Sequence, residues 1–62
     1  MDWDYANTPL LAKVLEKAVA SLPENDRTPK NAGVMRYAVR DGIIEGERDE
    51  QKLVDAALKS VS

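Results

Sequence analysis

Two arginines and a tyrosine at helical spacing are the most distinctive functional side chains of this sequence: Arg36, Tyr37 and Arg40. Steps of three and four residues place them on one face of a helix, with Gly33 among them and Lys30 at the margin. Arginine and tyrosine are enriched where proteins contact one another, and guanidinium groups match carboxylates and phosphates in two-pronged hydrogen bonds. We therefore expect this surface to bind another protein.

Two other interpretations of the same residues remain open. On a solvated face, Arg36 and Arg40 would pair with Asp41 or with the acidic start of a following helix. A contact with phosphate or nucleic acid through the two guanidinium groups ranks third.

The only Trp and one of the two Tyr lie near the N-terminus, at Trp3 and Tyr5. We expect one of these rings to fold back onto the helix that follows, which would bury its apolar area. The alternative is an exposed aromatic anchor for a partner, and this makes both residues the next candidates for a binding site.

Catalytic and metal-binding chemistry finds little support in the sequence. The chain has no His and no Cys, which removes the commonest general base, the commonest metal ligand and the reactive thiolate. Five carboxylates lie from Asp41 to Glu50, which suggests a calcium-binding loop. If such a loop starts at Asp41, its third position is Ile43 and its last is Lys52, although both positions need oxygen ligands. We expect no enzyme, metal or cofactor, and we interpret these carboxylates as acidic caps at the start of a helix.

A nucleic-acid function is the alternative. Ala38 and Gly42 have the four-residue spacing of a helix-turn-helix motif. Arg48, however, stands where that motif buries an aliphatic residue. The helix that would read the DNA starts with EGERDE, and these acidic residues would be repelled by the phosphates. The segment GIIEGE also resembles the helical tails of ParD-type antitoxins over these six residues. A small helical DNA-binding regulator or antitoxin-like protein is therefore the second hypothesis, and we do not expect a nucleic-acid partner.

The element with the clearest apolar spacing spans residues 8–22. Its apolar residues recur at steps of one, three and four, which predicts an amphipathic helix; they are Leu10, Leu11, Val14, Leu15, Ala18, Val19 and Leu22. Thr8 is predicted to cap this helix, Pro9 suits its first position, and Pro23 ends it. Leu15, at the centre of the stripe, is expected to be buried on both sides.

Two further helices are predicted over residues 28–42 and 47–61. Thr28 and Pro29 repeat the capping pair of the first helix, and Gly42 is expected to end the second helix in a left-handed conformation. Gly46 is expected to let the chain turn again. The third helix has acidic residues in its first turn and Lys59 near its end, as the helix dipole prefers.

The 62 residues predict one all-α domain, a small antiparallel three-helix bundle. A chain of this size buries barely enough surface to fold alone, and the apolar stripe of the first helix is wider than two short helices easily cover, so we expect a homodimer. Apolar runs of two or three residues are too short for a membrane span, and the net charge of −2 is ordinary, so we expect a cytoplasmic protein. The predicted function is a non-catalytic protein–protein interaction module, such as a small regulator, an adaptor or a phage-type inhibitor.

Overall fold

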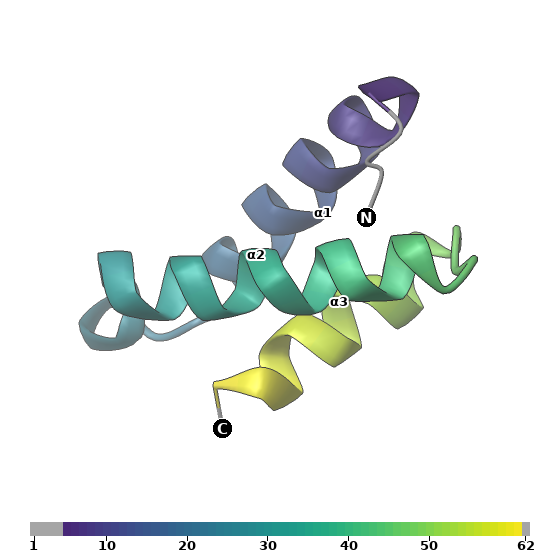
Figure 1. The fold of residues 1–62 in the computed structure, drawn as a ribbon. Coiled ribbons are helices and arrows are strands. Elements are labelled where there is room, and N and C mark those ends of the chain that lie inside the picture. The colour runs from purple at the N-terminus through teal and green to yellow at the C-terminus, as the bar shows by residue number, and fades with distance from the viewer. Residues whose placement is uncertain (1–4, 62) are drawn as a thin grey trace.

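The structure, a computed structural model that describes residues 5–61, consists of three α-helices that each contact the other two (Figure 1). The helices are α1 (Thr8–Ala20), α2 (Pro29–Ile44) and α3 (Glu50–Ser60). Short 3-10 turns, η1 (Tyr5–Asn7) and η2 (Glu24–Asp26), precede α1 and α2. No strand occurs within residues 5–61, and the predicted all-α class is confirmed. In Figure 1, α1 and α3 cross the longer α2 obliquely.

The first helix begins without the predicted cap. Its capping position is Asn7, whose side chain makes no capping hydrogen bond, and Thr8 already lies inside the helix. The reason is the 3-10 turn η1, because it brings Asn7 into a helical conformation, with φ −86° and ψ −6°, before Thr8 is reached. The prediction of a Thr8 cap is therefore wrong.

The C-terminal end of α1 lies at Ala20, two residues before the predicted end. Leu22 precedes Pro23, and a residue before proline is disfavoured in the α conformation. Arg27 closes this end, because its Nε donates to the Leu22 carbonyl at 2.9 Å and its Nη2 donates to the Ala20 carbonyl at 3.1 Å. These bonds satisfy carbonyl groups that the end of a helix leaves without partners.

The start of α2 follows the prediction. The Thr28 side chain accepts a hydrogen bond from the backbone N–H of Asn31 at 3.1 Å, and Pro29 follows as the first helical residue. An N-terminal cap of this kind stabilises a helix by about 1 kcal/mol.

The end of α2 differs from the prediction, because Gly42 lies inside the helix and Ile44 is its last residue. A Cβ atom on Gly42 would lie 2.7 Å from Cδ2 of Leu53 on α3, so the glycine is required for close helix packing and not for a turn. Gly46 takes the left-handed conformation instead, with φ 106°. Two backbone hydrogen bonds close the helix end, from Gly46 N–H to the Ile43 carbonyl and from Glu47 N–H to the Gly42 carbonyl.

The third helix begins at Glu50, later than the predicted residue 47. The carboxylate of Asp49 caps it by accepting from the backbone N–H of Lys52 at 3.1 Å. The carboxylate of Glu47 accepts from the backbone N–H groups of Arg48 and Asp49, so this segment forms a capping structure ahead of the helix. The interpretation of these carboxylates as helix caps is confirmed for Asp49, whereas Glu47 orders the backbone just before the helix.

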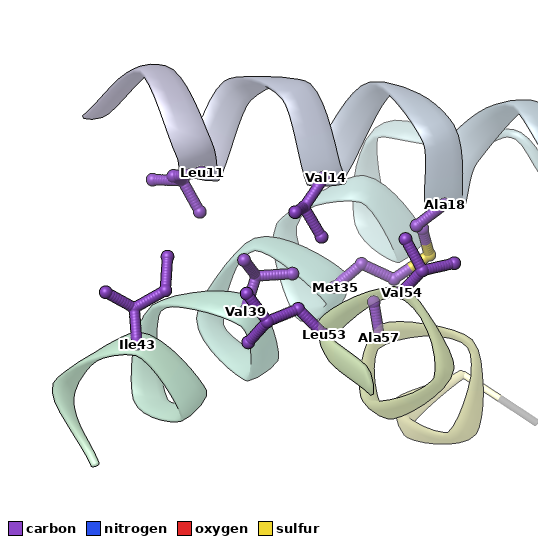
Figure 2. Packing of buried hydrophobic residues seen from close by; sticks show 9 residues of the cluster. All are labelled: Leu11, Val14, Ala18, Met35, Val39, Ile43, Leu53, Val54 and Ala57. Atoms are coloured by element: carbon purple, nitrogen blue, oxygen red, sulfur yellow. The ribbon is translucent and has the colours of Figure 1, made fainter. Parts of the chain in front are cut away.

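The core consists of nine buried apolar side chains, three from each helix (Figure 2). They are Leu11, Val14 and Ala18 of α1, Met35, Val39 and Ile43 of α2, and Leu53, Val54 and Ala57 of α3. Within residues 5–61 no polar or charged side chain is buried. None of the described helices is long and apolar enough to cross a bilayer.

One core prediction is wrong in detail. Leu15 is only half-buried, whereas its neighbour Val14 is fully buried. The inward line of α1 runs through Leu11, Val14 and Ala18, and Leu15 lies about 100° around the helix from Val14. The apolar stripe of α1 is therefore fully buried along this inward line, and its edge at Leu15 and Val19 packs against the core but is only partly covered.

Candidate protein-binding surface

The residues singled out from the sequence lie together on α2. Gly33, Arg36, Tyr37 and Arg40, which we call the α2 stripe, line one shallow hollow of about 370 Å³. The fully buried residues of α2 recur every four positions, at 35, 39 and 43, and fix the rotation of the helix so that the α2 stripe faces away from the core. The predicted juxtaposition of these residues is confirmed.

Exposure differs along the α2 stripe. Tyr37 is 66% exposed and Arg36 is exposed, whereas Arg40 and Gly33 are half-buried. Lys30 is exposed beside the α2 stripe but does not line the hollow.

The four arginines of the chain fall into two pairs. Arg27 and Arg48 donate to backbone carbonyls at the ends of α1 and α2, and the shortest of these bonds joins Arg48 Nη1 to the Ile43 carbonyl at 2.6 Å. Arg36 and Arg40 have no hydrogen bond or ion pair with any of the residues that the structure describes. Within the described residues, their guanidinium donors are therefore not engaged in polar contacts.

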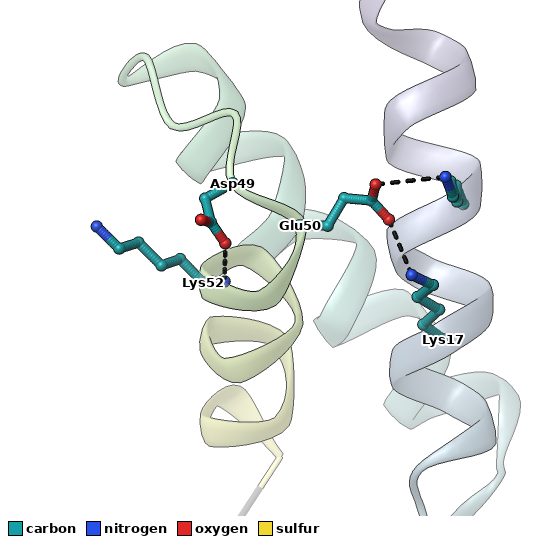
Figure 3. Close-up of polar contacts among 5 residues, drawn as sticks. Lys17, Asp49, Glu50 and Lys52 are labelled. Atoms are coloured by element: carbon teal, nitrogen blue, oxygen red, sulfur yellow. Dashed lines mark hydrogen bonds and ion pairs between the residues drawn. The ribbon is translucent and has the colours of Figure 1, made fainter.

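The acidic start of α3 pairs with α1 and not with the α2 stripe. Glu50 Oε1 lies 3.0 Å from Nζ of Lys17, and its Oε2 lies 3.3 Å from Nζ of Lys13 (Figure 3). Hydrogen bonds from Lys17 and then from Lys13 lower the pKa of the Glu50 carboxyl below its ordinary value of 4.5. The alternative in which Arg36 and Arg40 pair with Asp41 or α3 is thus not observed.

Of the two aromatic candidates near the N-terminus, the structure describes only Tyr5. Trp3 lies outside the described residues. Tyr5 is in η1, ahead of α1, and its side chain is 83% exposed, so the interpretation in which it packs onto α1 does not hold for this residue. Tyr5 does not line the hollow of the α2 stripe.

A second surface was only partly foreseen in the sequence. The half-buried edge of α1 forms a mainly apolar groove of about 530 Å³, which we call the α1 groove. Its lining residues are Ala12, Leu15, Glu16, Val19, Ala20 and Arg27. The excess width of the apolar stripe was the available signal, but which edge stays uncovered depends on how the other two helices pack.

The residues considered for DNA binding and for metal binding also have defined places in the structure. Gly42, which would occupy the turn of a helix-turn-helix motif, lies inside α2 and packs against Leu53. Within residues 5–61 no group of three or more acidic side chains is arranged to hold a metal ion.

In comparisons with known proteins, no family model matches the chain, and no curated protein or solved structure shows significant similarity to it.

Proposed function

We propose that the protein is a non-catalytic interaction module that binds another protein through the α2 stripe. The observation that carries this proposal is the state of Arg36 and Arg40, two arginines that line one hollow and make no hydrogen bond or ion pair with the described residues. The other two arginines are used to close helix ends. A pair of free guanidinium groups beside an exposed tyrosine is typical of the residues that dominate binding energy at protein interfaces.

The charge of the site indicates the chemistry of the partner. Guanidinium groups form short, charge-assisted hydrogen bonds with carboxylates, and such bonds contribute about 1.5–3 kcal/mol each. A stable interface covers about 800 Å² of each partner, which is about a fifth of the 4334 Å² surface of this chain. The contact must therefore extend beyond the α2 stripe, and the exposed residues of α2 around it are Lys30, Val34, which is 38% exposed, and Asp41.

We further propose that the chain forms a homodimer through the α1 groove. Leu15 and Val19 remain half-buried there, although both belong to the apolar stripe. The groove carries one acidic and one basic side chain, Glu16 and Arg27, so its charge does not oppose contact with a copy of itself. In this arrangement each copy keeps its α2 stripe free for a different protein.

The test of the α2 stripe is a charge reversal at both arginines. Immobilised protein is incubated with an extract of the cells that make it, and retained proteins are compared between the wild type and an Arg36→Glu, Arg40→Glu variant. We expect at least one protein to be retained by the wild type and lost by the variant, while the free energy of unfolding changes by less than about 1 kcal/mol, because neither guanidinium has a partner within the described chain. Lysine at both positions should weaken retention without abolishing it.

A control reverses a charge elsewhere. Lys52→Glu alters an exposed side chain of α3 and should leave retention unchanged. Retention by the Arg36→Glu, Arg40→Glu variant would contradict the proposal. Binding of random duplex DNA that weakens steeply with salt would instead favour the DNA-binding or antitoxin-like alternative.

A further inference from the structure

Gly33 is a glycine that the fold of the chain does not require. It lies within α2, where glycine is less favourable than alanine. A Cβ atom built on Gly33 meets nothing within 4 Å, and its φ is not positive. Gly42 differs in this respect, because a Cβ atom at that position would lie 2.7 Å from Cδ2 of Leu53.

The space above Gly33 is part of the binding surface. Gly33 lines the hollow together with Arg36, Tyr37 and Arg40, so any side chain at position 33 would project into it. Glycine on a helix surface lets another backbone approach closely, and the distance between two packed helices depends on the side chains at their contact. At 1.5 Å per residue, Arg36 and Arg40 lie about 4.5 and 10.5 Å from Gly33 along the axis of α2.

We propose that Gly33 is the crossing point for an acidic helix of the partner protein, whose carboxylates then lie on Arg36 and Arg40. The apolar flank of this contact is Ile44, which is 40% exposed and one helical turn beyond Arg40. This inference rests on the proposed function of the α2 stripe and adds the shape of the partner and the role of Gly33 in selecting it.

A second copy of the chain is a poor occupant for this site. A two-fold symmetric contact brings the same patch of both copies together. In an antiparallel crossing at Gly33, Arg36 would face Lys30 of the other copy, and in a parallel crossing it would face the same guanidinium group, so like charges meet in both cases. The carboxylates at the start of α3 are already engaged, since Glu50 pairs with two lysines and Glu47 and Asp49 accept backbone hydrogen bonds. Charge complementarity therefore favours an acidic helix from a different protein.

The experiment uses a defined acidic helix as the probe. An alanine-based peptide of roughly 20 residues, long enough to be helical in water, carries two glutamates one turn apart, and a control peptide carries glutamine at the same positions. The isotopically labelled full chain is titrated with each peptide up to about 1 mM, and its amide chemical shifts are followed. With the glutamate peptide only, we expect the shifts to change around Gly33, Arg36 and Arg40.

The decisive variant is Gly33→Ala. It should raise the melting temperature by about 4 °C, because alanine favours the helix and nothing obstructs the added methyl group. It should also lower the affinity for the glutamate peptide by about tenfold, because the methyl group keeps the two helices apart. Ala56→Gly, at an exposed position of α3 outside the α2 stripe, is the matched control, and it should lower the melting temperature without changing the affinity.

Four results would overturn the inference. The first two are equal binding of the glutamate peptide to the wild type and to Gly33→Ala, and no binding of this peptide to the wild type by about 1 mM. The third is that the wild type binds the glutamine peptide as tightly as the glutamate peptide. The fourth is that the chemical shifts at the α2 stripe change with protein concentration in the absence of peptide. The proposed function is tested separately. If the Arg36→Glu, Arg40→Glu variant loses its protein partner while Gly33→Ala is neutral, only the acidic-helix inference fails, and if that double variant keeps its partner, the proposed function fails as well.

Discussion

Glu50 is the side chain through which α3 is tied to α1 by charge. Lys13 and Lys17 are one turn apart on α1 and would repel each other, and the carboxylate of Glu50 accepts from both. Glu50 is also in the first turn of α3, where the helix dipole favours a negative charge. The same residue therefore relieves a repulsion on one helix and stabilises the start of another.

The state of Glu50 predicts how stability depends on pH. Hydrogen bonds from Lys17 and Lys13 lower the pKa of this carboxyl from 4.5 in the folded protein, so the folded state binds a proton less readily than the unfolded state. The resulting stabilisation is present above the ordinary pKa and is lost as the pH falls through the lowered value. We expect Glu50→Gln to melt below the wild type at pH 7, and the difference to disappear in strong acid. Thermal melts across this pH range measure it, and a difference that is the same at both extremes would contradict it.

The members of the α2 stripe could be predicted from the sequence, but the absence of internal ion pairs from their guanidinium groups could not. Helical spacing alone places Arg36, Tyr37 and Arg40 on one face. Whether their guanidinium groups pair with the acidic start of α3 depends on which helix that segment approaches, and this is decided by tertiary packing. Glu50 pairs with Lys13 and Lys17 of α1, so it forms no ion pair with the guanidinium groups of the α2 stripe.

At the scale of the elements, the Thr-Pro pairs at residues 8–9 and 28–29 show how local context decides a cap. Thr28 has an extended conformation, with φ −104° and ψ 156°, and its hydroxyl reaches the backbone N–H of Asn31. Thr8 follows a 3-10 turn and is already helical. The same two letters therefore begin one helix and lie within the other, because the residues before them differ.

The two glycines near the end of α2 illustrate the limit of turn signals. Gly42 and Gly46 are equivalent as candidates for a helix end, and only the packing partner separates them. Leu53 of α3 packs over Gly42, and α2 continues two residues further, to Ile44. That contact joins residues of different helices and leaves no trace in the local sequence pattern.

The packing of α1 and α3 predicts unequal costs for two leucines. Leu53 is 1% exposed and lies among all three helices, so Leu53→Ala should cost about 2–5 kcal/mol in the free energy of unfolding. Leu15 is half-buried on the uncovered edge of α1, and Leu15→Ala should cost only about 1 kcal/mol in the monomer. Urea denaturation at low protein concentration compares the two. Equal costs would mean that α1 is rotated from its position in Figure 2.

At the scale of the whole molecule, the core is small for the chain that it must order. Nine side chains are buried, two of them alanines, and within residues 5–61 no buried polar network adds to them. A domain of this size has a stability of only about 5 kcal/mol, so removing one large side chain such as Leu53 can unfold it. The number and type of helices follow from the apolar spacing, but their oblique crossing and the uncovered edge of α1 depend on the sizes of the side chains that meet in the core.

The uncovered edge of α1 leads to a prediction about assembly. If two copies pair through the α1 groove, the apolar side chains of Leu15 and Val19 become buried in the dimer, and the linkage between folding and association makes the melting temperature rise with protein concentration. We expect sedimentation to show a dimer at micromolar concentration.

Two variants separate assembly from folding. Leu15→Lys should yield a folded monomer, because the half-buried position lets the long side chain reach solvent. Val14→Lys, one residue earlier and fully buried, should unfold the chain, because a lysine charge there would have no partner in the core. A monomer of the wild type at about 100 µM, with a melting temperature independent of concentration, would exclude the dimer, since a folded dimer must gain stability as its concentration rises. In that case the α1 groove would stay exposed on a monomer, and the α2 stripe would remain the proposed binding surface.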